Sequence, residues 1–282
     1  MELRPFPLTS KRSQIKGDLN LLNRFLQALA RRFGYVVVLE SLPPEPDKGM
    51  EGSKLDYKYL DRLATLIEEF TGTIPTSFFE VGANFAQDAA YLAKKWQLSS
   101  GNVVVFEPHP LIVEKVRNRY DFLVVPKAVS NVNGRLQFNA VKLENTSNSG
   151  ISSLLPHIVN DEADNDLIEV EVIRLDDFAA ANSWAKIDFL KIDVEGLTYE
   201  VLEGLGNFLE NVGCIQIETE YIAVWKDQRT QSEVYKLLEE NHFQLIDHFT
   251  QMDGVQSDSL WIREDLVIHK IYDLSHKQWV TK

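Results

Sequence analysis

Cysteine is nearly absent from this sequence, in which Cys214 is the single example among 282 residues. One cysteine excludes an internal disulfide and a metal site built from several thiolates. Cys214 lies in the apolar run CIQIE, which predicts a buried and unreactive thiol. The six histidines show neither the HxH nor the HExxH spacing of zinc ligands. We therefore expect a protein of the reducing cytoplasm without a zinc centre.

Long apolar runs are missing too. No stretch approaches the roughly 18 apolar residues that span a bilayer, and the start, MELRPFPLTSKRSQ, lacks the apolar core of a signal peptide. We expect no transmembrane segment. Leucines recur at helical spacing within residues 17–34, with arginines nearby, which favours a helix packed on its own domain. A peripheral contact of this helix with a membrane stays open.

Positive charge is in short supply, because 29 Lys and Arg residues face 42 Asp and Glu residues. The net charge of -13 would oppose contacts with a phosphate backbone, so we expect no nucleic-acid partner. With 44% hydrophobic residues, the chain is long and apolar enough to bury a large core.

Short apolar runs alternate with amphipathic stretches through most of the chain. The pairs are TSFFEVG with FAQDAAYLAKKW, NVVVFEP with PLIVEKVRNRY, IDFLKIDVEG with LTYEVLEGLGNFL, and CIQIETE with QSEVYKLLEENH. Continuous apolar strands are typical of a mostly parallel sheet with helices on both faces, so the predicted class is doubly wound α/β. The last pair, FQLIDHF and DSLWIRE, has no helical stretch between its members and predicts antiparallel neighbours.

Two interruptions divide the chain. The connector SLPPEPDKGMEG and a helical pattern that ends at Gly72 close an N-terminal helical accessory segment, 1–72. The main domain is predicted at 73–265 and a tail at 266–282. Within the domain, an insertion at 131–177 contains GRLQFNAV and IEVEVIRL, which have the period of half-exposed strands. Its acidic run, 161–166, is interpreted as a solvated loop.

Acidic residues stand where the first two predicted strands end, which is where ligands bind in open parallel sheets. Glu80 is predicted to be the last residue of the first strand, and Gly82 permits a tight turn before Asn84. Two of the three glycines of a dinucleotide loop are missing. Glu107 ends the second strand, 25 residues beyond Gly82, where an acidic side chain accepts ribose hydroxyls. The alternative for Glu107 is stabilisation of the next helix's N-terminus.

The fourth and fifth strands also end in carboxylates. Asp193 and Glu195 are two positions apart, so we expect them to point to the same side of an extended strand. Repulsion would raise the pKa of one of them toward a value suited to a base. The alternative is that one caps the next helix and the other is solvated. Glu218 and Glu220 follow the same alternation.

With these residues in place, the chain resembles the FkbM-type methyltransferase family, within the class I S-adenosylmethionine (SAM) enzymes. The motifs, from about residue 76 to 247, are FEVGAN, FEPHP, KAVS, RLDDF, DFLKIDVEG and IQIETEY. The resemblance implies a Rossmann-like fold with a seven-stranded, mostly parallel sheet and an antiparallel last strand. It also implies S-adenosyl-L-methionine as the cofactor and S-adenosyl-L-homocysteine (SAH) as the product.

The resemblance further implies a cofactor pocket. Its residues would be Glu80, Gly82, Ala83, Asn84, Glu107, Pro108, Ala128, Val129 and Asp193. In this reading the turn after the first strand meets the methionine portion, Glu107 the ribose, Ala128 and Val129 the adenine, and Asp193 the sulfonium. Where the family has a second glycine, this chain has Ala86, which we expect to tighten the turn without abolishing binding.

A methyltransferase acting on an alcohol needs an aligned acceptor and a base. The predicted function is O-methylation of a hydroxyl on a sugar, glycolipid or polyketide-like product, a small-molecule or glycan acceptor that the N-terminal helices and the insertion would contact. The predicted catalytic residues are Asp193, Glu195 and Glu220, with His109 and His157 behind them. No metal is predicted, although a divalent cation on those carboxylates stays open. So do an NAD-dependent oxidoreductase, a nucleotide-sugar enzyme and a non-catalytic SAM-binding protein.

Overall fold

The computed structural model describes residues 57–144, 150–158, 165–251, 254–268, 270–273 and 278–281. Three of the predicted features lie outside these residues. They are the helix at 17–34, the connector SLPPEPDKGMEG and most of the acidic run at 161–166. Within the described part of the chain, every helix is too short or too polar to cross a membrane.

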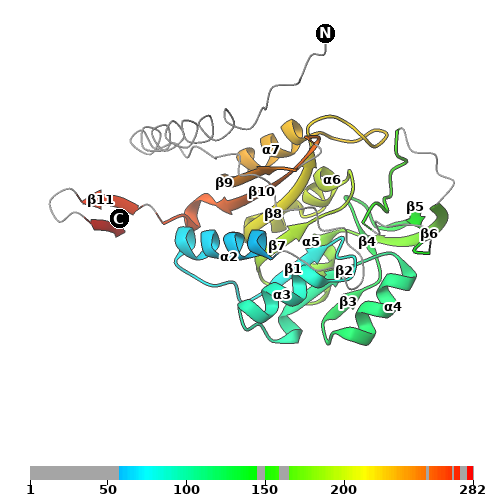
Figure 1. Ribbon diagram of the computed structural model, residues 1–282, viewed down its shortest axis with the longest axis horizontal. Coiled ribbons are helices and arrows are strands. Elements are labelled where there is room, and N and C mark those ends of the chain that lie inside the picture. Colours follow the sequence, from blue (N-terminus) through cyan, green and yellow to red (C-terminus); the bar gives the residue numbers. More distant parts are fainter. Residues whose placement is uncertain are drawn as a thin grey trace, which may run out of the picture. The chain divides into compact units, whose positions relative to one another are not determined.

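Seven strands form the main sheet, in the order β3-β2-β1-β7-β8-β10-β9 (Figure 1). They are β1 (Phe78–Val81), β2 (Val103–Phe106), β3 (Leu123–Val125), β7 (Ile187–Ile192), β8 (Val212–Glu220), β9 (Phe243–Thr250) and β10 (Gln256–Arg263). The pairs from β3 through β8 are parallel, whereas β10 is antiparallel to both β8 and β9. The mostly parallel sheet and the antiparallel last strand are therefore confirmed.

Helices cover both faces of this sheet, and side chains that alternate along the strands form a separate core under each. One core joins Phe78 and Phe189 to α2 (Lys58–Thr71), α3 (Gln87–Lys95) and α4 (Pro110–Arg119). The other joins Phe79 and Leu190 to α5 (Leu175–Ala181), α6 (Thr198–Glu203) and α7 (Gln231–Glu240). Short 3-10 turns lie at η1 (Ser100–Asn102), η3 (Gly206–Asn211) and η4 (Glu264–Leu266). Burial on two faces explains the continuous apolar runs of β1 and β2.

A second sheet, in the order β4-β6-β5, stands beside the first (Figure 1). Its strands are β4 (Ala128–Val129), β5 (Gly134–Val141) and β6 (Asn165–Ile173), with β5 and β6 antiparallel as their period-two pattern suggests. Ala128 and Val129 lie beyond the third strand of the main sheet, which ends at Val125. They pair with β6 instead, because Pro126 lacks an N–H and interrupts the ladder after Val125.

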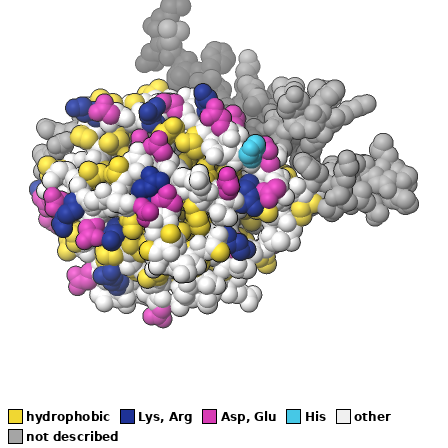
Figure 2. All heavy atoms as spheres, turned by 180° about the vertical axis from the view of Figure 1, so that it is seen from behind, with side chains coloured by type: hydrophobic (Ala, Val, Ile, Leu, Met, Phe, Trp, Pro, Cys, Tyr) yellow, Lys and Arg dark blue, Asp and Glu magenta, His cyan; other side chains and the backbone are white. Residues whose placement is uncertain are grey.

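Two further features concern the ends and the surface of the described chain. The residues predicted as a tail contain an antiparallel hairpin, β11 (Lys270–Asp273) with β12 (Gln278–Thr281). The face drawn in Figure 2 shows basic and acidic side chains interspersed, without a large patch of positive charge. A mixed surface of this kind offers no track for a phosphate backbone on that face.

Candidate active site

The carboxyl ends of β1, β2, β7 and β8 open into a cavity of about 390 Å³, closed on another side by residues of the second sheet and of segment 150–154. Every residue that the resemblance implies for the cofactor lines this cavity. Of the three predicted catalytic residues, Asp193 and Glu195 line it, and Glu220 does not. The structure thus brings together side chains that are up to 115 positions apart, those of Glu80 and Glu195.

The turn after β1 depends on glycine at position 82. Gly82 has φ +76°, and a Cβ there would lie 1.9 Å from the carbonyl oxygen of Asp193. The N–H groups of Gly82 and Ala83 both donate to the carbonyl of Phe106, at 3.0 Å. One detail of the prediction is wrong, because β1 ends at Val81 and Glu80 is the residue before it. The tight turn therefore lets the backbones that follow β1 and β7 meet at the cavity.

Ala86 holds a left-handed conformation, with φ +54°, at the residue before α3. A non-glycine residue in that region costs about 1 kcal/mol relative to glycine. The family's glycine would relieve this strain, but the Ala86 methyl group is fully buried in the core. The effect of Ala86 on cofactor binding stays a prediction.

Glu107 follows β2 directly, and its buried carboxylate accepts two backbone hydrogen bonds. Oε2 accepts from the N–H of Asn84 and Oε1 from the N–H of His109, each at 2.8 Å. Burial raises the pKa of Glu107 to about 7, and the two hydrogen bonds oppose that rise. His109 precedes α4, so Glu107 both supports that helix start and lines the cavity. Each carboxylate oxygen retains a second lone pair that can accept a ligand hydroxyl.

Sequence reasoning missed Lys191, whose buried ammonium lies among three carboxylates. Nζ is 2.8 Å from Oδ2 of Asp193, 3.2 Å from Oδ2 of Asp88 and 3.4 Å from Oε1 of Glu80. Burial alone would lower the pKa of Lys191, but the three carboxylates hold it well above its usual range. Burial raises the pKa of Glu80, against the opposing effect of Lys191. The signal was a lysine inside the apolar run FLKI, because a charge in a buried strand must be paired.

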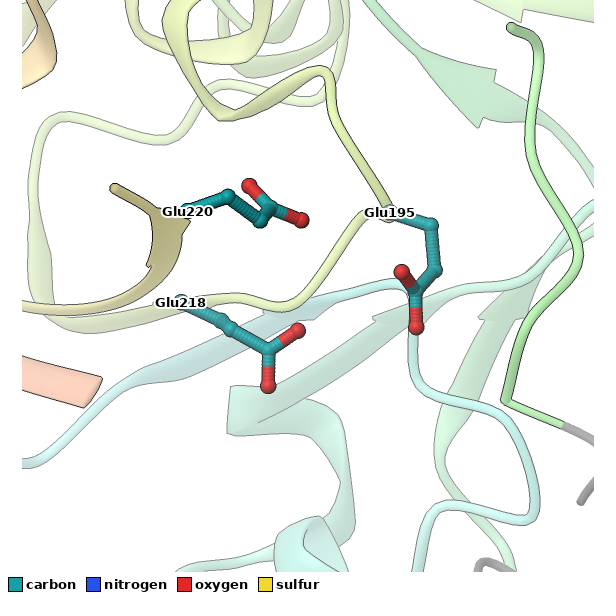
Figure 3. Close-up of side chains that lie close together, drawn as sticks. All are labelled: Glu195, Glu218 and Glu220. Carbon is teal, nitrogen blue, oxygen red and sulfur yellow. The ribbon is translucent and has the colours of Figure 1, made fainter. Parts of the chain in front are cut away.

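A second group of carboxylates meets between the end of β8 and the loop after β7. Oxygen atoms of Glu195, Glu218 and Glu220 lie within 4.8 Å of one another. Figure 3 shows Glu218 and Glu220 reaching from β8 toward Glu195 on the loop after β7. Glu218 also lines the cavity, and Glu220 lies buried beside it. We call these three residues the acidic triad.

The predicted orientation of Asp193 and Glu195 is wrong, and so is the alternative that one of them caps the next helix. Strand alternation does not orient them, because β7 ends at Ile192. Neither caps the next helix, since α6 begins without a side-chain cap. Burial first, and then repulsion from Asp193 and Glu195, raise the pKa of the Glu218 carboxyl well above its usual range.

Two glutamines that the sequence did not single out hold Glu218 in place. The Gln251 amide donates to Oε2 of Glu218 at 2.5 Å and to Asp258 at 3.2 Å, and the Gln256 amide donates to Oε1 of Glu218 at 3.0 Å. Burial raises the pKa of Glu220, which accepts a hydrogen bond from the Gln228 amide. No local signal marks these glutamines. Gln256 is placed by the register of β10 against β8, and Gln251, just after β9, donates its backbone N–H to the carbonyl of Gln256 at 2.8 Å.

The two candidate histidines do not line the cavity. His109 is buried, with Nε2 3.1 Å from the carbonyl oxygen of Val141. His157 packs edge-on against Trp225, with ring centroids 4.9 Å apart. The oxygen atoms of the acidic triad are the kind of donors that hard divalent cations prefer, so Glu218 replaces Asp193 in any such set.

A comparison with protein families bears on what the cavity holds. The family model described as the methyltransferase FkbM domain matches residues 80–245, which is more than half of the chain. The chain belongs to the FkbM methyltransferase family. Its cofactor is S-adenosyl-L-methionine, and the NAD-dependent alternative is set aside. No curated protein matches the chain.

Solved structures with a similar chain path include another FkbM protein. The methyltransferase FkbM from Methylobacillus flagellatus KT is 14% identical over 66% of this chain and 43% of that chain, with a TM-score of 0.43. Magnesium protoporphyrin IX methyltransferase (ChlM) from Synechocystis PCC 6803, solved with bound SAM, is 10% identical over 77% of this chain and 88% of that chain, also with a TM-score of 0.43. The present chain thus spans less than half of the Methylobacillus protein. Neither likeness carries weight beyond the family match.

The lining of the cavity can be compared with the charges of the cofactor. SAM carries a sulfonium and an ammonium cation, and the cavity lining includes six carboxylates but only two lysines. Both lysines are ion-paired, Lys191 as described and Lys127 with Glu171 at 2.8 Å. The backbones that follow β1 and β7 approach each other closely at Gly82, and Glu107 keeps lone pairs that can accept a ligand hydroxyl.

Proposed function

We propose that this FkbM methyltransferase is an O-methyltransferase that acts on a hydroxyl of a sugar, glycolipid or polyketide-like product. The observation that carries the proposal is the position of the acidic triad, whose Glu195 and Glu218 line the same cavity as the cofactor residues. A hydroxyl must lose its proton as it is methylated, and a carboxylate within reach can accept that proton.

The charge of the cavity supports a neutral, hydroxyl-bearing acceptor. Six carboxylates line it, and its two lysines are already ion-paired. An acceptor carrying phosphate or carboxylate groups would find no unpaired lysine among the lining residues to bind it. The amides of Gln251 and Gln256 already donate to Glu218, while the remaining lone pairs of the lining carboxyl groups can accept hydrogen bonds from acceptor hydroxyls. A sugar-like acceptor with several hydroxyls can donate such bonds.

Each residue has a proposed role. SAM supplies an activated methyl group on a cationic sulfur when bound. Gly82, Ala83 and Asn84 hold its methionine portion, Glu107 accepts its ribose hydroxyls, and Asp193, fixed by Lys191, borders the sulfonium. Glu195 is the proposed base because it lines the cavity. Glu220 does not line the cavity, and its proposed role is to orient the acceptor through the other two residues of the acidic triad.

The insertion within the methyltransferase domain completes the proposal. We infer that residues 131–177 contact the acceptor, as the sequence suggests, whereas the helix predicted at 17–34, the other expected contact, lies outside the described residues. Cys214 is buried, and burial raises the pKa of its thiol to about 12, which accords with a protein of the reducing cytoplasm.

Calorimetry and a methyl-transfer assay test the proposal together. We expect micromolar binding of SAH and none of NAD, followed by methylation of neutral glycosides in preference to sugar phosphates and amines. Asp193→Asn and Glu195→Gln should retain SAH binding and lose methyl transfer, by about 100-fold for a base. Glu169→Gln, the same change on an exposed residue of β6, is the control.

Three results would contradict the proposal. Full turnover of Glu195→Gln would move the base elsewhere. A preference for amine acceptors would replace O-methylation with N-methylation. Binding of SAH without transfer to any acceptor in the panel would favour the non-catalytic SAM-binding protein that the sequence left open.

A further inference from the structure

Residues 150–158 of the insertion, which we call the strap, link strand β5 to the loop that carries Glu195. Asn139 of β5 and Ser153 of the strap exchange backbone hydrogen bonds, at 2.8 and 3.3 Å. The Asn139 amide also donates to the carbonyls of Ser153 and Leu155, at 3.3 and 3.2 Å. Asn139 and Ser153 are both buried. The second sheet therefore fixes the position of Ser153.

Ser153 joins the strap to the loop that carries Glu195. Its Oγ accepts the N–H of Leu155 at 3.0 Å and donates to the carbonyl oxygen of Glu195 at 2.6 Å. The Leu155 N–H occupies one lone pair of the Ser153 hydroxyl, so the hydroxyl proton of Ser153 is directed to the carbonyl oxygen of Glu195. One buried hydroxyl thus connects the insertion to the backbone of the proposed base, 42 positions later.

The other side of the Glu195 loop is packed against Trp225, which is also connected to the strap. Gly196 has φ +84°, and a Cβ there would lie 2.6 Å from Cδ1 of Trp225. Trp225 forms a β-bridge with His157, and the N–H of Lys226 donates to the carbonyl of Pro156 at 2.9 Å. The loop that carries Glu195 is therefore held between the Ser153 hydroxyl of the strap and Trp225, which also contacts the strap.

The same connections reach Glu220. Oε1 of Gln228 accepts the N–H groups of Val224 and Trp225, at 2.9 and 3.1 Å, while its amide nitrogen donates to Glu220. The N–H of Ile158 in turn donates to the carbonyl of Val224 at 2.9 Å. The strap is thus connected by hydrogen bonds to both ends of the acidic triad.

We propose that Ser153 is a positioning residue that sets the backbone of Glu195, and with it the place of that carboxylate against Glu218 and Glu220. The strap then makes the insertion part of the catalytic apparatus as well as a wall of the cavity. The role of Glu195 as base rests on the proposed function, whereas the effect of Ser153 on the Glu195 loop does not.

Hydrogen exchange of the unliganded full chain, followed by mass spectrometry, tests this inference. Ser153→Ala removes one oxygen atom, and we expect amide exchange across residues 193–201 to become about three- to tenfold faster, as for the loss of one hydrogen bond. Ser152→Ala is the matched control, because Ser152 also lines the cavity but its Oγ accepts the N–H of Val141 at 3.1 Å instead. It should leave that exchange unchanged.

Kinetics then separate positioning from general stability. Once an acceptor is known, Ser153→Ala should lower kcat and leave KM for SAM and the affinity for SAH unchanged. If Ser153→Ala does not fold, Asn139→Ala loosens the strap from its other side and should speed the same exchange. Two results would overturn the inference. One is an equal rate of amide exchange across residues 193–201 in Ser153→Ala and Ser152→Ala, and the other is a rate in Asn139→Ala that does not exceed that of wild type.

The two proposals fail in different ways. Faster exchange in Ser153→Ala without any methyl acceptor would leave the strap's role standing and remove the O-methyltransferase. If an acceptor is known and Ser153→Ala shows normal exchange and normal kcat, the role of the strap is refuted and the O-methyltransferase stands.

Discussion

Replacing Glu107 with glutamine should change both the stability and the cofactor affinity of the protein, each in a way that depends on pH. The substitution preserves the size of the side chain and removes its charge. In the folded protein the Glu107 carboxylate is 6% exposed and accepts the N–H groups of Asn84 and His109. Burial nevertheless raises its pKa from 4.5 to about 7.

The size of the stability effect follows from that rise. A group whose pKa is higher in the folded than in the unfolded state stabilises the fold fully below the unfolded pKa, and this contribution is lost as the pH rises through the folded pKa. A shift from 4.5 to about 7 corresponds to about 3 kcal/mol. Between about pH 5 and about pH 8, wild type should therefore lose about 2 to 3 kcal/mol relative to Glu107→Gln.

The cofactor affinity should respond in the opposite sense, because ribose hydroxyls are accepted best by the ionised carboxylate. With a pKa of about 7, only about one tenth of Glu107 is ionised at about pH 6, so wild type should bind SAH about tenfold more weakly there than at about pH 8. Glu107→Gln should bind about 10- to 100-fold more weakly than wild type at about pH 8 and show no such dependence.

Urea unfolding of the unliganded proteins and calorimetric titration of SAH, each at both pH values, measure the two effects. Glu114→Gln, the same change on an exposed residue of α4, is the control. Full SAH affinity in Glu107→Gln would refute the ribose assignment. An identical pH dependence of unfolding in wild type and variant would refute the argument from burial.

Two further substitutions test the packing around the cavity. Gly82→Ala should destabilise the protein by at least about 2 kcal/mol and weaken SAH binding, because its Cβ would lie 1.9 Å from the Asp193 carbonyl oxygen. Gly101→Ala, with no atom within 4 Å of the added carbon, should do neither. Equal unfolding midpoints for the two variants would contradict the argument from Gly82. Lys191→Met should cost about 3 to 5 kcal/mol in urea unfolding by leaving buried carboxylates unpaired. The loss of stability should be larger at about pH 8 than at about pH 5, because the raised pKa of Glu80 lets that group protonate at the lower pH. A loss of stability that does not depend on pH would count against the pairing of Lys191 with Glu80.

Much of the fold could be predicted because its signals are local. The apolar runs of β1 and β2 are continuous since both faces of the sheet are covered. The absence of a helical stretch between β9 and β10 indicated their antiparallel pairing. The break at Pro126 was visible as well, but what Ala128 and Val129 pair with was not, because their partner β6 begins 36 positions after Val129.

The candidate site divides in the same way. Glu107 and Asp193 could be located because each directly follows an apolar strand. Lys191 carried a signal, a charge in a buried strand, that the reading did not use. Gln251 and Gln256 carried none, since a glutamine near a strand end is ordinary until another strand brings a carboxylate to it.

The sequence by itself determined the class of sheet, the strands whose ends meet at the ligand edge, and the acidic character of that edge. These depend on residues two to four positions apart and on the rule that parallel strands share an edge. Only the tertiary structure decided that Glu218 completes the acidic triad, that Lys191 holds Asp193, and that Ser153 is joined to Glu195. Such contacts, and the pKa values that follow from them, depend on segments far apart in the chain that meet only when it folds.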